Sequence, residues 1–389
     1  MARRVLMTAL CLLCAGLPCV PGWAATGDTV SDYYDAVDGN QISEERLNDS
    51  VIDYDELGSL IHLYNADVQE LTDSTERTRA DYVQIRDTLE AEGESAQRKK
   101  QAAKDNGETD DYMEYSGYQS VYQSAVKSYN NMLGRLDSYY SNKSRLSLER
   151  QLTQSAQNLM ISYWSASLQA DYADKTEELY QNLYEDTVTK QSAGLATEQD
   201  VLTAYNSQLS MSASSESASE SAKEVYQSLC LLLGVDAEGS MTIGEIPAVE
   251  EDFLSARDLE ADISKAIDNN ADLISERATD SGDTSSTNRK NRTIAEYENK
   301  IRLKMNDLYE SIQNAQIAYT AAGTGYSSAQ ITWNNVQSKY NLGMLSRSEY
   351  LEEEMNYLQK EANVQSAKLS LLQAIETYQW AVQGIVTLD

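Results

Sequence analysis

The chain has 389 residues and a formal net charge of −31 at pH 7, with 62 acidic against 31 basic side chains. This excess of carboxylates excludes the nucleic-acid backbone as a natural partner and disfavours an anionic membrane surface. The chain has one His and, beyond its first 24 residues, one Cys, which argues against a His/Cys metal site and against His-based catalysis. We expect no cofactor. The acidity itself fits either scattered surface carboxylates that keep the protein soluble or an acidic lumen or docking surface.

The first residues have the pattern of a secretory signal. Two Arg precede an apolar run, Val5 to Leu17, and Gly22-Trp23-Ala24 ends in a small-residue cleavage site. The cysteines of this segment follow Leu or Pro, which disfavours a lipoprotein signal. We expect residues 1–24 to be removed on export, which leaves Cys230 alone and allows no intrachain disulfide. Residues 25–53 are acidic and weakly patterned, and we expect them to form a loosely ordered lead-in.

The first half of the chain predicts long helices. Apolar residues at three- and four-residue steps predict a helix over residues 54–89. Residues 90–111 are polar and contain two Gly, which indicates a solvated helix end or a loop. A very long helix is predicted over 112–189, and a return helix over 201–233 that Gly234 ends.

A linker over residues 237–257 leads into the second half. It carries three Gly or Pro positions within a few residues. Helix restarts at Asp258, and residues 279–291 form a break rich in Ser, Thr, Asn and Asp. No later segment approaches the ~20 apolar residues that a membrane-spanning helix needs, so we expect no helix in a bilayer.

The most regular pattern of the chain lies in this second half. Apolar and small residues alternate steps of four and three over more than five heptads, which predicts a coiled-coil seam against a partner helix. Gly323 and Gly325 lie within it and cost roughly 1 kcal/mol each relative to Ala. The return helix begins near Leu351 and runs to Trp380. The predicted seam residues are Ile301, Met305, Leu308, Ile312, Ala315, Tyr319, Ala322, Tyr326, Ala329, Trp333, Val336 and Tyr340.

Two stretches repeat one motif, Lys190 to Leu202 and Lys339 to Leu351. Each carries, in order, a Lys, a Gly, a large apolar residue, a hydroxyl, an acid and a Leu. The Gly ends one helix with a positive φ, and the hydroxyl three positions later begins the next as its N-cap. We therefore expect the tips of two long helical hairpins near residues 194 and 343. The capping pairs are Thr197 with Asp200 and Ser346 with Glu349.

Hairpins of this length make a rod. A helix of about 45 residues spans roughly 70 Å, and the seams consist largely of Ala, Ser and Tyr, so two helices alone bury little apolar area. We therefore expect lateral association with further copies, which would bury more apolar area. A monomeric four-helix bundle is the alternative. The 26 Tyr fit ordinary helix packing better than aromatic ligand binding.

These features resemble the outer-membrane efflux protein family, the TolC-like exit ducts of tripartite pumps and type I secretion systems. The resemblance rests on the duplicated half, the Gly-Leu-x-Thr and Gly-Met-x-Ser tips, and a return helix that ends at Leu229 to Asp236. It implies two repeats, residues 54–236 and 258–389, that form an α-barrel protomer. Family members are trimers with a hollow twelve-helix cylinder, and they dock to an adaptor, the membrane fusion protein, and through it to an inner-membrane pump.

The resemblance also implies roles for individual positions. Tyr340 matches a gate aromatic, Asp200 a gate acid, and Glu349 with Glu352 the paired acids of the entrance, where a trimer would stack two carboxylate rings. Each acid has a plainer alternative as a capping or surface residue. The basic partner of the gate is missing, since Leu345 stands at its place. The residues that match the adaptor-docking tips are Gly194, Leu195, Thr197, Gly343, Met344 and Ser346.

One departure from the family concerns strands. Its members insert two membrane-barrel strands per half, at places that correspond here to residues 90–111 and 279–291. Neither segment has the alternating apolar residues or aromatic girdles of such strands. We therefore expect an all-α protein of long antiparallel hairpins in two tandem repeats, with little or no β-barrel. It would lie in the cell envelope, associated with an outer membrane or in the periplasmic or cell-wall space.

Two functions remain open on the sequence alone. The leading one is an export conduit component without chemistry of its own. The alternative is an exported coiled-coil structural or interaction protein of the cell envelope that has no transport activity. An enzyme is disfavoured, because the exposed Glu349 and Glu352 have no evident means to separate their pKa values for acid–base work.

Overall fold

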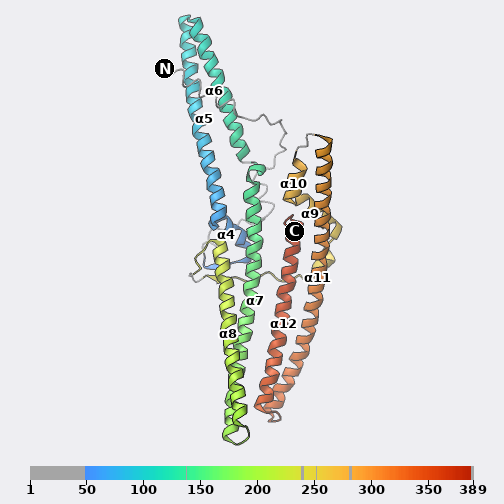
Figure 1. Cartoon of the computed structure of the whole chain (residues 1–389). Helices are drawn as coiled ribbons and strands as arrows, with labels where there is room; N and C mark the ends of the chain where they lie inside the picture. The colour runs from blue at the N-terminus through green and yellow to red at the C-terminus, as the bar shows by residue number, and fades with distance from the viewer. Residues whose placement is uncertain (1–48, 137, 238–240, 251, 280–282, 387–389) are drawn as a thin grey trace. The chain divides into compact units, whose positions relative to one another are not determined.

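The structure is a computed structural model that describes residues 49–136, 138–237, 241–250, 252–279 and 283–386. Most of these residues are helical, and the long helices form antiparallel hairpins, which confirms the predicted all-α class (Figure 1). The predicted signal, and most of the lead-in, lie outside the described residues. The elements are β1 (Val51–Ile52), η1 (Tyr54–Glu56), α4 (Leu57–Tyr64), α5 (Ala66–Asn106), α6 (Thr109–Leu136), α7 (Tyr139–Ser192), α8 (Glu198–Leu233), β2 (Thr242–Ile243), η2 (Phe253–Ala256), α9 (Leu259–Asn269), α10 (Ala271–Ala278), α11 (Thr284–Asn341) and α12 (Arg347–Val382).

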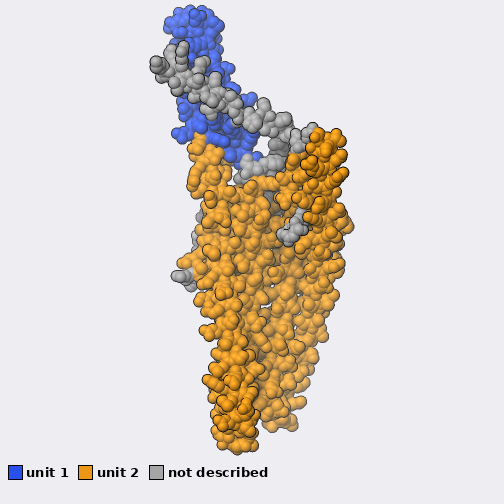
Figure 2. All heavy atoms as spheres, viewed as in Figure 1, with its two compact units in different colours: residues 1–41, 82–142 blue, residues 42–81, 143–389 orange. Residues whose placement is uncertain are grey.

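Packing divides the chain into two units (Figure 2). Unit 1 comprises residues 1–41 and 82–142, and unit 2 comprises residues 42–81 and 143–389. Helix α5 begins in unit 2 and continues into unit 1. The two long hairpins with the predicted tips both belong to unit 2.

The first hairpin of unit 2 consists of α7 and α8. Its largest buried cluster lies far from the turn, where Ala156 and Met160 of α7 and Leu229 and Leu233 of α8 are fully buried. Nearer the turn the contact is thinner, and the rings of Tyr184 and Tyr205 meet with their centroids 5.6 Å apart. Burial of apolar area therefore stabilises this hairpin mainly at its open end.

The second hairpin consists of α11 and α12, and its seam follows the predicted heptads. Every one of the predicted seam residues is buried or half-buried. Ile301, Met305 and Ile312 are almost completely buried, together with Ile375 and Tyr378 of α12. The four-and-three pattern in the sequence thus marks the face of α11 that packs on α12.

The two hairpins of unit 2 lie side by side. Trp380 of α12 donates a hydrogen bond from Nε1 to Oε1 of Gln157 of α7 over 2.6 Å, so α7 and α12 are neighbours. Helices α8 and α11 flank this pair on opposite sides (Figure 1). The order across unit 2 is therefore α8, α7, α12, α11.

A similar joint ties the end of the return helix in each half to a short helix of the same half, which is α4 for α8 and α9 for α12. Asn65 donates from Nδ2 to the carbonyl of Leu232 over 2.8 Å, and Asn270 donates likewise to Gly384 over 3.1 Å. Beside each joint stands a Gly with positive φ, 77° at Gly234 and 92° at Gly384. A Cβ there would lie 2.1 Å and 2.4 Å, respectively, from the backbone of the short helix. Only Gly fits at these positions.

A short parallel ladder joins the start of the first half to the linker. Val51 pairs with Thr242 and Ile52 with Ile243, so β2 lies inside the predicted linker. Ile52 is completely buried and Ile243 nearly so, and both belong to the core of the first hairpin. The linker therefore contributes to the packing of unit 2.

Two predicted helices and one predicted break have wrong boundaries. The helix expected over 54–89 is interrupted at Asn65, whose backbone is extended. Its Oδ1 accepts from the amide of Val68 in the first turn of α5 and so caps that helix. The helix expected over 112–189 is interrupted after Leu136, where α6 ends. The predicted break over 279–291 is shorter, because Asp283 caps α11 by accepting from the amide of Ser286 over 2.6 Å.

Unit 1 contains the later part of α5, α6 and the first residues of α7. Helices α5 and α6 form a hairpin that turns at Gly107. Their contacts include the edge-on ring pair of Tyr82 with Tyr129, whose centroids lie 5.7 Å apart, and a cation–π contact of Lys100 with Tyr112. No residue of α6 is fully buried. The polar stretch 90–111 is thus the helical tip of this hairpin. Across the described part of the chain, no helix combines the length and the apolar character required to cross a membrane.

Candidate functional site

The two tips of unit 2 have the same backbone geometry. At the first, Gly194 has φ 76°, and the amide of Leu195 donates to the carbonyl of Lys190 over 2.8 Å. At the second, Gly343 has φ 71°, and the amide of Met344 donates to Lys339 over 2.9 Å. These paired bonds close each helix with a left-handed Gly. The shared motif therefore encodes the same turn twice.

The hydroxyl and the acid of each motif form a complete capping box. Thr197 donates its amide to Oδ2 of Asp200 over 2.7 Å, and Ser346 donates its amide to Oε2 of Glu349 over 2.8 Å. In return, Thr197 Oγ1 and Ser346 Oγ accept the amides of the two acids. The backbone amides of Thr197 and Ser346 lower the pKa of Asp200 and of Glu349, and the hydroxyl bonds lower them further.

Apolar side chains at the tips are widely exposed. Leu195 and Met344, two of the residues predicted to dock an adaptor, are 79% and 70% exposed. Leu342 is 72% exposed and was missed by the sequence analysis, although it directly precedes the second Gly. Each hairpin of unit 2 therefore exposes at least one large apolar side chain at its tip.

The residues predicted to form a gate occupy different environments. Glu352 is exposed on the first turns of α12, near Glu349. Tyr340 is half-buried, and its ring packs against Tyr350 of its own hairpin with the centroids 4.3 Å apart. The structure therefore gives Asp200 and Glu349 a capping role and Tyr340 a packing role. Their roles in a pore stay predictions.

Polar contacts join the two hairpins just above the tips. Ser348 donates to Oδ2 of Asp186 over 2.9 Å and accepts from Nζ of Lys190, which also pairs with Asp186 over 2.8 Å. Nη2 of Arg347 donates to Oδ1 of Asn182 over 2.9 Å. We call these five residues the tip latch. Burial acts to raise the pKa of Asp186, but the bonds from Lys190 and Ser348 outweigh it and lower the pKa.

Sequence reasoning missed most of the tip latch. Lys190 was noted only as part of the repeated motif, and Arg347 lies two residues beyond the position where a basic gate residue was expected. The signal for Asn182 and Asp186 was their spacing, since residues four apart share one face of α7. That spacing does not reveal which helix faces them.

Two further acids, Glu178 of α7 and Glu354 of α12, lie farther from the tips than the tip latch. Burial raises the pKa of Glu354 on α12, and the negative charge of Glu178 on α7 raises it further. This carboxyl is therefore harder to ionise than a solvated one. Among the described residues, no cluster of His, Cys, Asp and Glu is arranged to hold a metal ion.

The comparisons with known proteins rest on structure. No protein-family model matches the chain, and no curated protein sequence matches it either. A membrane protein from Pseudomonas aeruginosa is 15% identical, with 95% of this chain and 98% of that chain covered and a TM-score of 0.50. The outer-membrane channel OprN is 14% identical, with the same shares covered and the same TM-score of 0.50. The CmeC outer membrane channel of Campylobacter jejuni is 13% identical over 69% of this chain and 68% of that chain, with a TM-score of 0.45.

The first two similarities extend over nearly the whole length of both chains, so they concern the complete arrangement of the hairpins and not a single helical pair. At this level of identity they establish architecture alone. The chain has the TolC-like fold of the outer membrane efflux channels.

Proposed function

We propose that this chain is the protomer of a helical export conduit in the cell envelope. Three copies would enclose a channel and dock by their tips to an adaptor protein and, through it, to an inner-membrane pump. The observation that supports this most is the fold similarity to the outer-membrane channel OprN along 95% of the chain. A signal over residues 1–24 would direct the chain to export.

The tips support the docking part of the proposal. Leu195, Leu342 and Met344 are exposed at the turns of both hairpins, and the capping boxes hold each turn in one conformation. A rigid turn with exposed apolar side chains loses little entropy on binding. The two hairpins would therefore present equivalent apolar tips to the adaptor.

The tip latch supports a closed resting state. It connects α7 and α12 within one protomer through Asp186, Lys190 and Ser348 and through the pair of Asn182 with Arg347. Widening an entrance requires the tips of the two hairpins to separate, which breaks these contacts. The exposed Asp200, Glu349 and Glu352 would then line the entrance and attract cations.

The domain organisation follows from the same proposal. Residues 54–236 and 258–389 would be two repeats with tips near 194 and 343, joined by the linker 237–257. The two Asn joints, at Asn65 and Asn270, support a duplicated unit, because each pairs with the end of the return helix of its own half.

The first test is the mass and the end-on view of the purified protein without detergent. We expect a trimer by light scattering and a hollow ring in electron micrographs. A monomer at every workable concentration, or a solid bundle in projection, would overturn the conduit. The result would then favour an exported coiled-coil rod.

The second test concerns docking and transport. A strain that lacks the gene is complemented with the parent chain or with Leu195→Glu and Met344→Glu together, and the accumulation of fluorescent efflux dyes and the secretion of proteins are measured. The tip variant should keep the oligomer but behave like the deletion. Full complementation by the variant would contradict docking through the tips.

A further inference from the structure

A groove of about 530 Å³ lies between α7 and α12 of unit 2. Its residues include the buried Ile161 and Leu369, and the others are mostly small or polar. Short side chains such as Ala166 leave space that larger residues would fill. The groove borders α12 from Gln359 to Gln373, a length of roughly 21 Å at ~1.5 Å per residue. A cavity of this size accommodates a small ligand.

Bonds between α7 and α12 hold the groove open at both of its ends. Toward the base of the hairpins, Trp380 donates from Nε1 to Gln157 over 2.6 Å. Toward the turns, the tip latch joins the same two helices, with Ser348 donating to Asp186 over 2.9 Å. The groove lies between these two cross-links, so its walls keep their spacing without a ligand. A preformed site loses little entropy when it binds.

The groove is uncharged, although the chain has a net charge of −31. None of the fourteen described residues that line it is an acid or a base. Asp171 follows Gln169 by two positions and is therefore turned by about 160° around α7, and Glu361 is turned likewise from Gln359 on α12. An ion of either sign finds no opposite charge among the lining residues. The groove therefore suits a neutral ligand.

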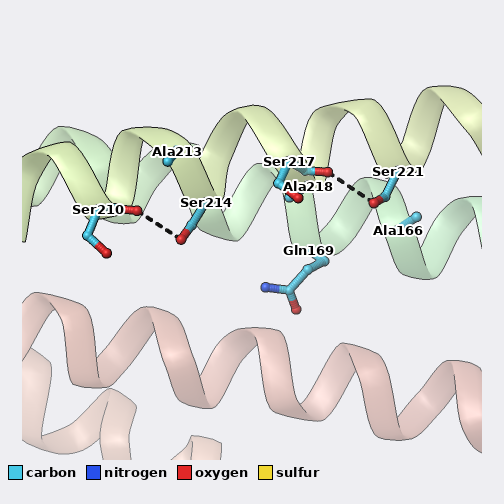
Figure 3. Close-up of a pocket in the computed structure, with 8 residues that line it drawn as sticks. All are labelled: Ala166, Gln169, Ser210, Ala213, Ser214, Ser217, Ala218 and Ser221. Atoms are coloured by element: carbon cyan, nitrogen blue, oxygen red, sulfur yellow. Dashed lines mark hydrogen bonds between the residues drawn. The ribbon is translucent and has the colours of Figure 1, made fainter.

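Four amide side chains line the groove. Gln169 belongs to α7, and Gln359, Asn363 and Gln373 belong to α12; all four are exposed. None of the four side chains makes a hydrogen bond to another residue that the structure describes. Each amide offers two N–H donors and one carbonyl acceptor. Figure 3 shows the Gln169 side chain extending from α7 away from α8, toward α12.

A second groove, of about 520 Å³, adjoins the first and extends it onto α8. Ala166 and Gln169 line both grooves. The residues that line the second groove are also uncharged, and half of them are serines of α8 (Figure 3). These serines are Ser210, Ser214, Ser217 and Ser221. The neutral, hydrogen-bonding surface therefore continues across α12, α7 and α8.

An oligosaccharide matches this surface. Each sugar hydroxyl both donates and accepts hydrogen bonds, as amide and Ser side chains do. The half-buried Tyr172 lines the groove and supplies an aromatic ring, on which the C–H groups of a sugar ring can pack. A peptide is matched less well, because the backbone groups of α7 and α12 are satisfied within the helices and cannot pair with an extended strand.

The groove and one of the predicted entrance acids lie on the same side of α12. Glu352, Gln359, Ser366 and Gln373 stand one heptad apart, so they follow one line along the helix. In the proposed conduit Glu352 would line the entrance. The groove would then lie on the channel wall, farther from the tips than the entrance acids.

We propose that the groove between α7 and α12 binds an uncharged oligosaccharide, and that such saccharides are solutes of the conduit. The second part rests on the proposed function, because only a conduit places the groove on a channel wall. The first part rests on the groove itself. The carboxylates of the entrance would repel anions, and the uncharged groove beyond them would favour neutral chains rich in hydroxyl groups.

Isothermal titration calorimetry of the purified chain with maltohexaose tests the binding. We expect saturable binding, which Gln359→Ala should weaken by about fivefold through the loss of one net hydrogen bond. Gln365→Ala is the matched control, because Gln365 is also an exposed amide of α12 but does not line the groove. Equal weakening by the two substitutions would contradict the site.

A variant with a filled groove and two further probes complete this test. Ser366 is exposed and lines the groove, so Ser366→Tyr should abolish binding and leave the circular dichroism unchanged. Chitotetraose, which carries acetamido groups, is the second sugar, and an uncharged Gly-Ser peptide is the third probe. Binding of the peptide alone, or no binding of either sugar up to its solubility limit, would overturn the proposal.

An export assay separates this inference from the proposed function. A strain that lacks the gene is compared with the strain complemented by the parent chain, and the saccharides released to the medium are measured by mass spectrometry. Sugar binding by the purified chain with equal release from both strains would confirm the site and overturn its part in export. A hollow trimer that restores dye efflux but binds neither sugar would keep the conduit and overturn this inference.

Discussion

The two long hairpins of unit 2 share one turn motif but differ in what holds their helices together near the tip. In the second hairpin, five rings form a continuous ladder. Tyr340 contacts Tyr350, Tyr350 contacts Trp333, and Trp333 stacks on Tyr357, which meets Tyr326 through a hydroxyl contact of 3.0 Å. In the first hairpin the ring contact nearest the tip is that of Tyr184 with Tyr205. Many of the other residues of α8 are Ser or Ala.

The two hairpins therefore differ in how much stabilisation near the tip comes from contacts within the hairpin. A ladder of stacked rings stabilises a hairpin from within, at about 0.5–1.5 kcal/mol per ring pair beyond the buried area. Small side chains contribute little internally, but they let a neighbouring helix approach closely. The second hairpin therefore has more stabilising ring contacts of its own near the tip than the first.

The largest expected effect comes from removing the centre of the ladder. Trp333 is 9% exposed and touches two rings, so Trp333→Ala should lower the free energy of unfolding by about 3 kcal/mol. Tyr184→Ala should cost only about 1 kcal/mol, because Tyr205 opposite is 42% exposed. Guanidinium unfolding followed by circular dichroism at 222 nm measures both. Equal losses would remove the contrast between the hairpins.

A smaller effect of opposite sign is expected at a helical glycine. Gly323 lies inside α11, and no heavy atom lies within 4 Å of the position that its Cβ would take. Gly323→Ala should therefore stabilise the protein by about 1 kcal/mol. Gly194→Ala should instead destabilise it by about 1 kcal/mol, because that residue has φ 76°. If Gly323→Ala destabilised the assembled protein alone, a neighbouring copy would be approaching α11 at that point.

The smallest effect concerns the pH response where the two hairpins meet. Burial and the charge of Glu178 raise the pKa of Glu354 above its ordinary value of 4.5. The neutral form is favoured in the fold, so this contribution is full below pH 4.5 and is lost as pH rises through the raised pKa. Glu354→Gln should remove roughly half a kcal/mol of that pH dependence, since the half-buried carboxyl is partly screened.

Thermal unfolding of the parent and of Glu354→Gln across this pH range measures the effect. The difference between the two chains isolates Glu354, because the other carboxylates are common to both. Identical pH profiles would show that the fold does not raise the pKa of Glu354.

Features with a local cause were predictable from the sequence. The heptads of α11 predicted its buried face, and the Gly and hydroxyl of each motif predicted the two turns, because both patterns act over a few residues. The break at Asn65 was not predictable, since the carbonyl of Leu232 that holds it lies far along the chain. The tip latch was hidden for the same reason, because its bonds connect two different hairpins.

The candidate site is only partly settled by these patterns. The sequence placed Thr197, Asp200, Ser346 and Glu349 in capping boxes, and the structure confirms those bonds. The docking and gating roles come from family resemblance and stay predictions. Leu342 was identified only by its exposure in the structure, because a single apolar residue before a Gly has no periodic pattern in the sequence.

The two-residue ladder of β1 with β2 joins two segments that lie far apart in the sequence, on either side of the first hairpin. Its first strand is made near the start of the chain, and its partner follows only after both helices of the first hairpin. Ile52 and Ile243 cannot reach their buried sites until then, and such distant pairings form slowly. The base of the first hairpin can therefore be completed only when the linker is present as well as both of its helices.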